Sequence, residues 1–218
     1  MKKVMTLTVA AALAGGAAMT QAYEAGDWIL RAGAVTVAPD ADSDTVPGLG
    51  VTVDVDDDTQ LSIIPVYMVT EDFGLELLAA TPFKHDIEVN EAPLDAGSTK
   101  HLPPTLSLQW YPRGGSSGWQ PYVGVGLNYT VFFDEKTAGD LEGIVGKSKL
   151  DLDDSFGLSA SAGVDIPFGE NWSFNAGIWY LDIDTTATVT LREADNAKVK
   201  FDVDIDPWVY NIGIAYKF

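Results

Sequence analysis

Large apolar side chains alternate with smaller or more polar ones along the C-terminal end of the chain. The apolar positions follow one another at a spacing of two: Trp208, Tyr210, Ile212, Ile214, Tyr216 and Phe218. A period of two places these side chains on one face of a β-strand. Aromatic residues lie at both ends of that face, as is typical of a strand that crosses a membrane between two interfacial girdles. The segment is therefore predicted to be a membrane-spanning strand.

Seven further segments repeat the alternation, so the chain is predicted to be all-β. The eight segments are 27–37, 61–69, 74–83, 105–111, 121–133, 155–168, one that starts at 172 and one that ends at 218. In each, one alternating set is assigned to the outer face and the other to the inner face. Because the number of strands is even, the N-terminus and the C-terminus of the chain are expected on the same side of the membrane.

The connections between the segments alternate in length. Residues 71–73, 113–120 and 169–171 are short and rich in turn formers, whereas residues 38–60, 84–104 and 134–154 are long, polar and acidic. Short periplasmic turns that alternate with long extracellular loops are typical of outer-membrane barrels. We therefore predict an eight-stranded antiparallel transmembrane β-barrel over residues 23–218, with both termini on the periplasmic side.

The apolar set changes parity near the extracellular end of the last segment. Residues 199–205 are apolar at odd positions, whereas the set from Trp208 onward is apolar at even positions. Pro207 lacks an N–H and cannot complete a ladder bond, so a β-bulge is expected near residues 206–207. The same change follows Tyr180 in the seventh segment.

Composition narrows the function further. Residues 1–22 have the form of a signal peptide, with Lys2 and Lys3 before a short apolar run and small residues up to Ala22. A net charge of −19 disfavours binding to nucleic acid. The chain has no cysteine, which excludes disulfides and thiolate sites. No segment after Ala22 reaches the roughly 18 to 20 apolar residues of a membrane-spanning helix.

The inner faces of the predicted strands carry too many apolar residues for a general porin. Eight strands also leave an interior that side chains or one small ligand can fill, so a wide aqueous pore is excluded. The candidates for an apolar constriction are Leu78 and Trp179, with Ile64, Val66 and Met68 on the same inner surface. The alternative is that these side chains only fill the lumen.

Polar inward positions gather near the periplasmic turns. They are Arg31, Glu76, Gln109, Asp165 and Lys217. We predict that Arg31 pairs with Glu76 or Asp165 and that the group closes the barrel floor. A hydrophobic passenger would then leave sideways through the wall into lipid. A structural ion-pair network without any gating role is the other interpretation.

At this point the sequence resembles the OmpW family of small outer-membrane proteins. The matching stretches occur in family order from one end of the mature chain to the other and are 24–37, 74–85, 101–111, 121–134, 179–187 and 206–218. The resemblance implies an eight-stranded barrel with a narrow apolar lumen, associated with moving small hydrophobic molecules across the outer membrane. The expected partners are outer-membrane lipid, lipopolysaccharide and small hydrophobic ligands. The first and third long loops depart most from the family pattern, because they are more acidic.

No metal or cofactor is expected. The run from Asp40 begins like a calcium loop, but Thr45 and Val51 stand where the loop needs glycine and glutamate. The Asp runs at 54–58, 151–154 and 202–206 are interpreted as a solvated rim that can share divalent ions with lipopolysaccharide. His85 and His101 flank one long loop, and without a third ligand they are interpreted as loop structure.

Catalysis is not expected either. The chain has no GxSxG or HExxH motif, and Ser98 or Ser107 near His101 would pair only by chance. Two functions remain open: a narrow conduit or binding site for small apolar compounds, and a structural barrel with a filled lumen and interacting acidic loops.

Overall fold

The structure, a computed structural model, describes residues 22–47, 50–90 and 94–218. Apart from Ala22, the predicted signal peptide lies outside these ranges. The elements are β1 (Trp28–Ala38), β2 (Asp42–Ser43), β3 (Val53–Val55), β4 (Asp58–Met68), β5 (Phe73–Ala80), β6 (Phe83–Val89), β7 (Asp95–Leu102), β8 (Thr105–Trp110), β9 (Gln120–Thr137), α1 (Gly139–Val145), β10 (Ser148–Leu152), β11 (Ser155–Pro167), β12 (Trp172–Leu181), β13 (Asp184–Leu191), β14 (Ala197–Asp204) and β15 (Trp208–Lys217).

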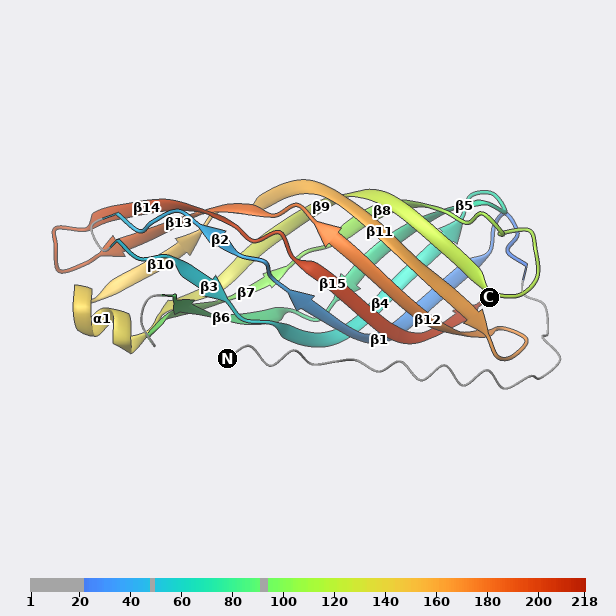
Figure 1. The fold of residues 1–218 in the computed structure, drawn as a ribbon, viewed down its shortest axis with the longest axis horizontal. Coiled ribbons are helices and arrows are strands. Elements are labelled where there is room, and N and C mark those ends of the chain that lie inside the picture. Colours follow the sequence, from blue (N-terminus) through green and yellow to red (C-terminus); the bar gives the residue numbers. More distant parts are fainter. Residues whose placement is uncertain (1–21, 48–49, 91–93) are drawn as a thin grey trace.

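Eight of these strands form a closed antiparallel barrel, which confirms the predicted fold class. Neighbouring strands follow in the order β11, β12, β15, β1, β4, β5, β8 and β9, and β9 pairs back to β11. The strands slant across the long axis of the molecule (Figure 1). β1 and β15 join the two ends of the chain, with Gly33 opposite Gly213. Each closing pair buries backbone polar groups that lipid could not satisfy.

The outer surface of the barrel is apolar, as the alternation predicts. The predicted outward side chains are exposed, among them Leu61, Val125, Phe156, Trp208, Tyr210, Ile212 and Ile214. Their inward neighbours on the same strands, such as Ile64 and Val209, are buried. A surface of this kind is stable against hydrocarbon and not against water. In the part of the chain that the structure describes, no helix is long and apolar enough to cross a membrane.

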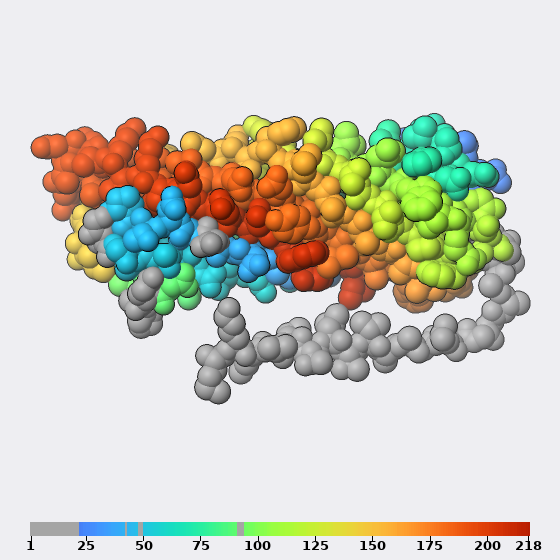
Figure 2. Space-filling model, turned by 45° about the horizontal axis from the view of Figure 1, so that its top comes forward, coloured from blue at the N-terminus to red at the C-terminus, as the bar shows by residue number. Residues whose placement is uncertain are grey.

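The three long connections are not loops, contrary to the prediction. They contain β2, β3, β6, β7, β10 and α1, which together with β13, β14 and the end of β9 extend the barrel beyond its apolar surface. We call this extension the lobe. The β13–β14 connection (red-orange) and the β8–β9 connection (lime) lie at opposite ends of the molecule (Figure 2). The acidic residues of the three long connections led to the prediction of polar loops. In the structure these acidic residues alternate with inward apolar residues such as Val53 and Leu150.

The predicted β-bulge near residues 206–207 is wrong. Tyr180 pairs with Trp208 in the barrel, and Asp184 pairs with Asp204 in the lobe. From the first pair to the second, each of the two strands advances by four residues. Neither strand therefore contains an extra residue between these pairs. The hairpin keeps one register, and the expected slip after Tyr180 is wrong for the same reason.

The side chains on the two faces of this hairpin keep their parity as well. Val203, Ile205 and Val209 are all odd-numbered, and all three point inward and are buried. What changes is the medium outside, which is lipid around the barrel and water around the lobe. Apolar residues therefore occupy the outer face in the barrel and the inner face in the lobe. A hairpin without any register slip then shows an apparent change of parity in its sequence.

Candidate functional site

A polar group fills the lumen at the short-turn end, and Arg31 is at its centre. Its side chain on β1 is fully buried between two carboxylates from distant strands. Arg31 Nη1 lies 2.7 Å from Glu76 Oε2 on β5, and Nη2 lies 2.7 Å from Asp165 Oδ2 on β11. The prediction offered these two acids as alternatives, and the guanidinium contacts both. We call this group, with the side chains bonded to it, the plug.

Every N–H of the Arg31 guanidinium has an acceptor. Nε donates to Asp165, Nη1 donates to Glu76 and Gln109, and Nη2 donates to Asp165 and to the Tyr111 hydroxyl. A buried ion pair withstands desolvation only when its remaining donors and acceptors are also satisfied. One side chain thus ties β1 to β5, β8 and β11 inside the lumen.

The carboxylates of the plug are also saturated. Gln109 Nε2 donates to Glu76 at 2.6 Å, and Trp179 Nε1 donates to Glu76 at 3.0 Å. Asp165 accepts from Tyr23 and Asn175, each at 2.8 Å. Tyr122 joins the plug as well, because its ring lies 4.3 Å from Arg31 Cζ and its hydroxyl accepts from Asn175. Sequence reasoning missed the plug residues Tyr23, Tyr111, Tyr122 and Asn175. For Asn175 the signal was present, because it is inward by parity.

Lys217 does not join the plug, although it was predicted with Arg31. Its ammonium lies 3.2 Å from Asp27 and donates to the Ala22 carbonyl oxygen. It therefore ties the C-terminal strand to the start of β1 at the rim. Four of the five predicted floor residues, Arg31, Glu76, Gln109 and Asp165, contact one another.

The predicted constriction residues are buried but fall into two clusters. Ile64, Leu78 and Trp179 belong to the apolar cluster that continues into the lobe. Val66 and Met68 belong to a second cluster, in which they pack with the plug residues Tyr23, Tyr111 and Tyr122. Because Trp179 also donates a hydrogen bond to Glu76, it connects the cluster that continues into the lobe with the plug.

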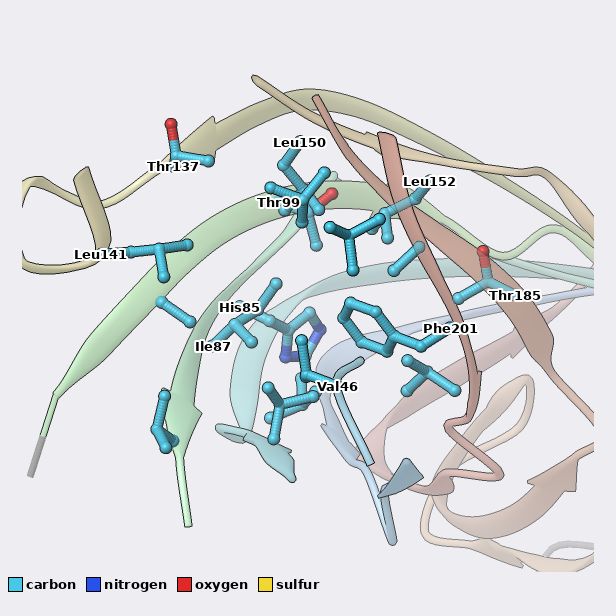
Figure 3. A pocket seen from close by; sticks show the side chains of 18 of the residues that line it. Val46, His85, Ile87, Thr99, Thr137, Leu141, Leu150, Leu152, Thr185 and Phe201 are labelled. Carbon is cyan, nitrogen blue, oxygen red and sulfur yellow. The ribbon is translucent and has the colours of Figure 1, made fainter. Parts of the chain in front are cut away.

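An apolar cavity of about 300 Å³ lies in the lobe. None of the five predicted constriction residues lines it. Its wall comes from β3, β6, β7, β9, β10, β13, β14 and the ends of α1, and it includes Val53, His85, Ile87, Leu150, Ala187 and Phe201 (Figure 3). The odd-numbered apolar run at residues 199–205 signalled this wall in the sequence, but it was interpreted as a register slip.

The two histidines meet at this cavity. Their rings are stacked with centroids 4.8 Å apart and planes 4° from parallel, and Phe83 and Phe132 flank them. Both side chains are buried on the paired strands β6 and β7. Burial lowers the pKa of His85, and burial together with the neighbouring His85 lowers the pKa of His101 to about 3. Both rings are therefore neutral at neutral pH.

Neither of the two serines considered with His101 forms a hydrogen bond to it in the described part of the chain. Ser98 and His101 are three positions apart on β7, so their side chains point to opposite faces. The Ser107 hydroxyl is buried on β8 without a hydrogen-bond partner. Within the described ranges, one acidic group has ligand atoms within 4.8 Å of one another: Asp182, Asp184 and Asp206.

Comparison with known proteins agrees with this architecture. The OmpW family profile matches residues 24–218. Outer membrane protein W of Vibrio cholerae is 44% identical over 216 residues and covers 97% of each chain. Outer membrane protein W of Escherichia coli is 42% identical over 221 residues, with both chains covered completely.

A solved barrel gives the same result in three dimensions. The crystal structure of the outer membrane protein OprG from Pseudomonas aeruginosa superposes with a TM-score of 0.84 at 44% identity. The match covers 90% of this chain and 98% of that one. The chain therefore belongs to the OmpW family and is an eight-stranded β-barrel of the bacterial outer membrane.

Proposed function

We propose that this barrel takes up small hydrophobic molecules at the lobe and passes them into the outer membrane. The apolar cavity of about 300 Å³ carries the proposal. Its volume is at the lower end of the range for small-molecule sites. None of its lining residues carries a carboxylate, ammonium or guanidinium group. An ion would lose its hydration there without compensation, whereas an uncharged apolar molecule would gain contacts.

The axial route below the cavity is closed. Leu78, Ile64 and Trp179 are packed under it as an apolar constriction, and the plug fills the lumen beneath them. The plug was expected to be a floor, and its fully bonded Arg31 supports that role. Val66 and Met68 add apolar packing beside the plug, not a passage. A passenger in the lobe would therefore find no continuous bore to the periplasm.

A sideways exit has support in the strand pairing. β5 pairs with β8 as far as Leu78 opposite Thr105, and the continuing strands β6 and β7 pair again from Phe83 opposite His101. The backbone ladder is therefore interrupted between these two pairs. The skipped residues include Pro82, Pro103 and Pro104, which have no N–H to donate. Leu61 and Leu106 are exposed on the outer face near this gap. We infer that the passenger crosses the wall here and enters lipid.

The acidic rim suggests a second contact with the membrane surface. Asp182, Asp184 and Asp206 lie where β12 and β15 leave the apolar surface. Carboxylates at this level would hold divalent cations shared with the phosphates of lipopolysaccharide.

We also infer that residues 1–22 are removed on secretion. Tyr23, which donates to Asp165 in the plug, would then be the first residue of the working chain.

The test fills the cavity without touching the plug. Ala187 is buried in the cavity wall, and Ala160 is exposed on the outer surface of the barrel. Cells that lack the protein would be given the wild-type chain, Ala187→Phe or Ala160→Phe. The readout is the uptake rate of a small uncharged aromatic dye that fluoresces in lipid.

The wild type and Ala160→Phe should speed uptake equally, and Ala187→Phe should fall toward the rate of cells without the protein. Equal rates in all four strains would contradict the proposal. That result would favour the alternative, a structural barrel whose lumen is filled and whose acidic rim serves surface interactions.

A further inference from the structure

Two side chains in the wall of the apolar cavity each have one buried nitrogen atom without a hydrogen-bond partner. Both Nε2 atoms of the stacked histidines, His85 and His101, are buried without a hydrogen-bond partner. In Figure 3 the His85 ring points among the lining side chains, between Ile87, Val46 and Phe201. A buried polar atom without a hydrogen-bond partner destabilises the fold, because it has lost its bonds to water. Its persistence in an otherwise apolar wall calls for a ligand that bonds to it.

The other ring nitrogen determines what the His85 Nε2 atom can bind. His85 Nδ1 lies 2.5 Å from the Asp56 carbonyl oxygen. A carbonyl oxygen can only accept, so Nδ1 carries the ring proton. In the neutral ring the Nε2 atom then has a free lone pair and no hydrogen. It can accept a hydrogen bond but cannot donate one, and its partner must carry an O–H or N–H group.

The remaining polar side chains of the wall are already engaged. The hydroxyls of Thr99, Thr137 and Thr185 donate to oxygens of the protein. None of the lining side chains is charged at neutral pH, and the rim above them is acidic. A carboxylate ligand would be repelled and would offer no donor, and an ammonium ligand would lose its hydration. The wall thus favours an uncharged donor.

We propose that the cavity binds a neutral amphiphile that carries one hydroxyl group on an apolar body, and that this hydroxyl donates to His85 Nε2. The inference rests on the proposed uptake of hydrophobic molecules and narrows their class from hydrocarbons to alcohols and phenols. The hydroxyl oxygen retains lone pairs, so it also suits the adjacent ring of His101 when that ring donates.

The volume indicates the size of the molecule. Liquid water occupies about 30 Å³ per molecule, so a cavity of about 300 Å³ suits roughly ten non-hydrogen atoms. Three matched probes have nearly this size: 1-octanol, which donates and accepts; heptyl methyl ether, which only accepts; and nonane, which does neither. Only the first can satisfy His85 Nε2.

The experiment uses the full mature chain in lipid nanodiscs and two NMR readouts. The sequence has two histidines, so the ¹⁵N signals of their rings are readily assigned. The Leu150 methyl signals report occupation of the cavity, because Leu150 lines it. Each probe is titrated at equal measured concentration in the lipid phase, into the wild type and into His85→Phe. Phenylalanine keeps a ring of similar size and removes the acceptor.

All three probes should shift the Leu150 signals, and only 1-octanol should shift the His85 Nε2 signal. Octanol should bind about 2- to 10-fold more tightly than the ether, the effect of one neutral hydrogen bond. His85→Phe should abolish this preference and leave ether binding unchanged. The comparison of probes on the wild type stands even if that variant does not fold.

Three results would overturn the inference. Equal binding of octanol and ether without a change at Nε2 would leave the proposed function intact and remove the hydroxyl preference. An Nε2 signal that is hydrogen-bonded before any probe is added, and that octanol does not move, would mean that water occupies the position. Leu150 signals that respond to no probe would contradict both the inference and the proposed function.

Discussion

Arg31 Nη1 lies 2.7 Å from Glu76 Oε2, and neither side chain is exposed to solvent. The two residues are on β1 and β5, with β4 between them in the barrel wall, so the contact bridges two strands that are not hydrogen-bonded neighbours. Asp165 completes the arrangement from β11, on the other side of the barrel. Two carboxyl groups face the one guanidinium, and neutral donors from Gln109, Trp179, Tyr23 and Asn175 complete their hydrogen bonds.

Removal of the central cation should weaken the barrel and open it to ions. Arg31→Ala would leave Glu76 and Asp165 buried without a counter-charge, at a cost of about 3–5 kcal/mol in the free energy of unfolding. Urea unfolding from lipid vesicles measures this change, and single-channel recording measures conductance. Arg192→Ala, at an exposed position in the turn between β13 and β14, is the control and should change neither. Unchanged conductance in Arg31→Ala would count against a plug.

The bond from Trp179 to Glu76 can be tested by replacing the indole with an aromatic ring that has no N–H group. Trp179→Phe keeps an aromatic ring at the constriction and removes the N–H that lies 3.0 Å from Glu76 Oε1. Because that acceptor is charged and buried, we expect a loss of about 1.5–3 kcal/mol in the free energy of unfolding. Trp208→Phe, on the lipid-facing surface, should cost clearly less. Equal losses would mean that the bond adds nothing.

The seam between β1 and β15 should tolerate no side chain at Gly33. A Cβ there would lie 2.7 Å from Gly213 Cα and still closer to the Ile212 carbonyl oxygen. Gly33→Ala should therefore lower the free energy of unfolding by about 1–3 kcal/mol. Gly143→Ala in α1 is the matched change, because nothing lies within 4 Å of its Cβ. A helical alanine should stabilise by about 0.5–1 kcal/mol. The same sign at both positions would contradict this account.

Acid should loosen the lobe. The pKa of His101 is lowered to about 3 in the folded lobe, whereas an exposed histidine titrates near 6.5. Between these two values the opened lobe binds a proton that the closed lobe excludes, so stability is lost as the pH falls below 6.5. At pH 5 the loss for His101 is about 2 kcal/mol relative to pH 7.5.

Hydrogen exchange of the β6 and β7 amides, corrected for intrinsic rates at each pH, would measure this opening. Most carboxylates remain ionised at pH 5, so the histidines dominate the change. The double variant His85→Phe, His101→Phe should show the same protection at both pH values. Protection that falls equally in the double variant would assign the effect to the acidic residues around Asp56 instead.

Local alternation was enough to predict the barrel. The two faces of a strand are set by a period of two, and each short turn fixes the direction of the next strand. The eight segments therefore matched the eight barrel strands to within a few residues, and Leu61, Ile212 and Ile214 were correctly assigned to the outer surface. The inward positions of Arg31, Glu76 and Asp165 followed from the same count.

The sequence by itself determined the number of barrel strands and the face on which each barrel side chain lies, because both depend on neighbours one or two residues away. The tertiary structure alone decided that Arg31 contacts both acids while Lys217 bonds to Asp27, because barrel register brings together residues more than forty positions apart. It also decided that the long connections form a lobe around a cavity. Whether an apolar residue belongs outside or inside depends on whether lipid or water surrounds the strand at that level, and the period of a strand is the same in both.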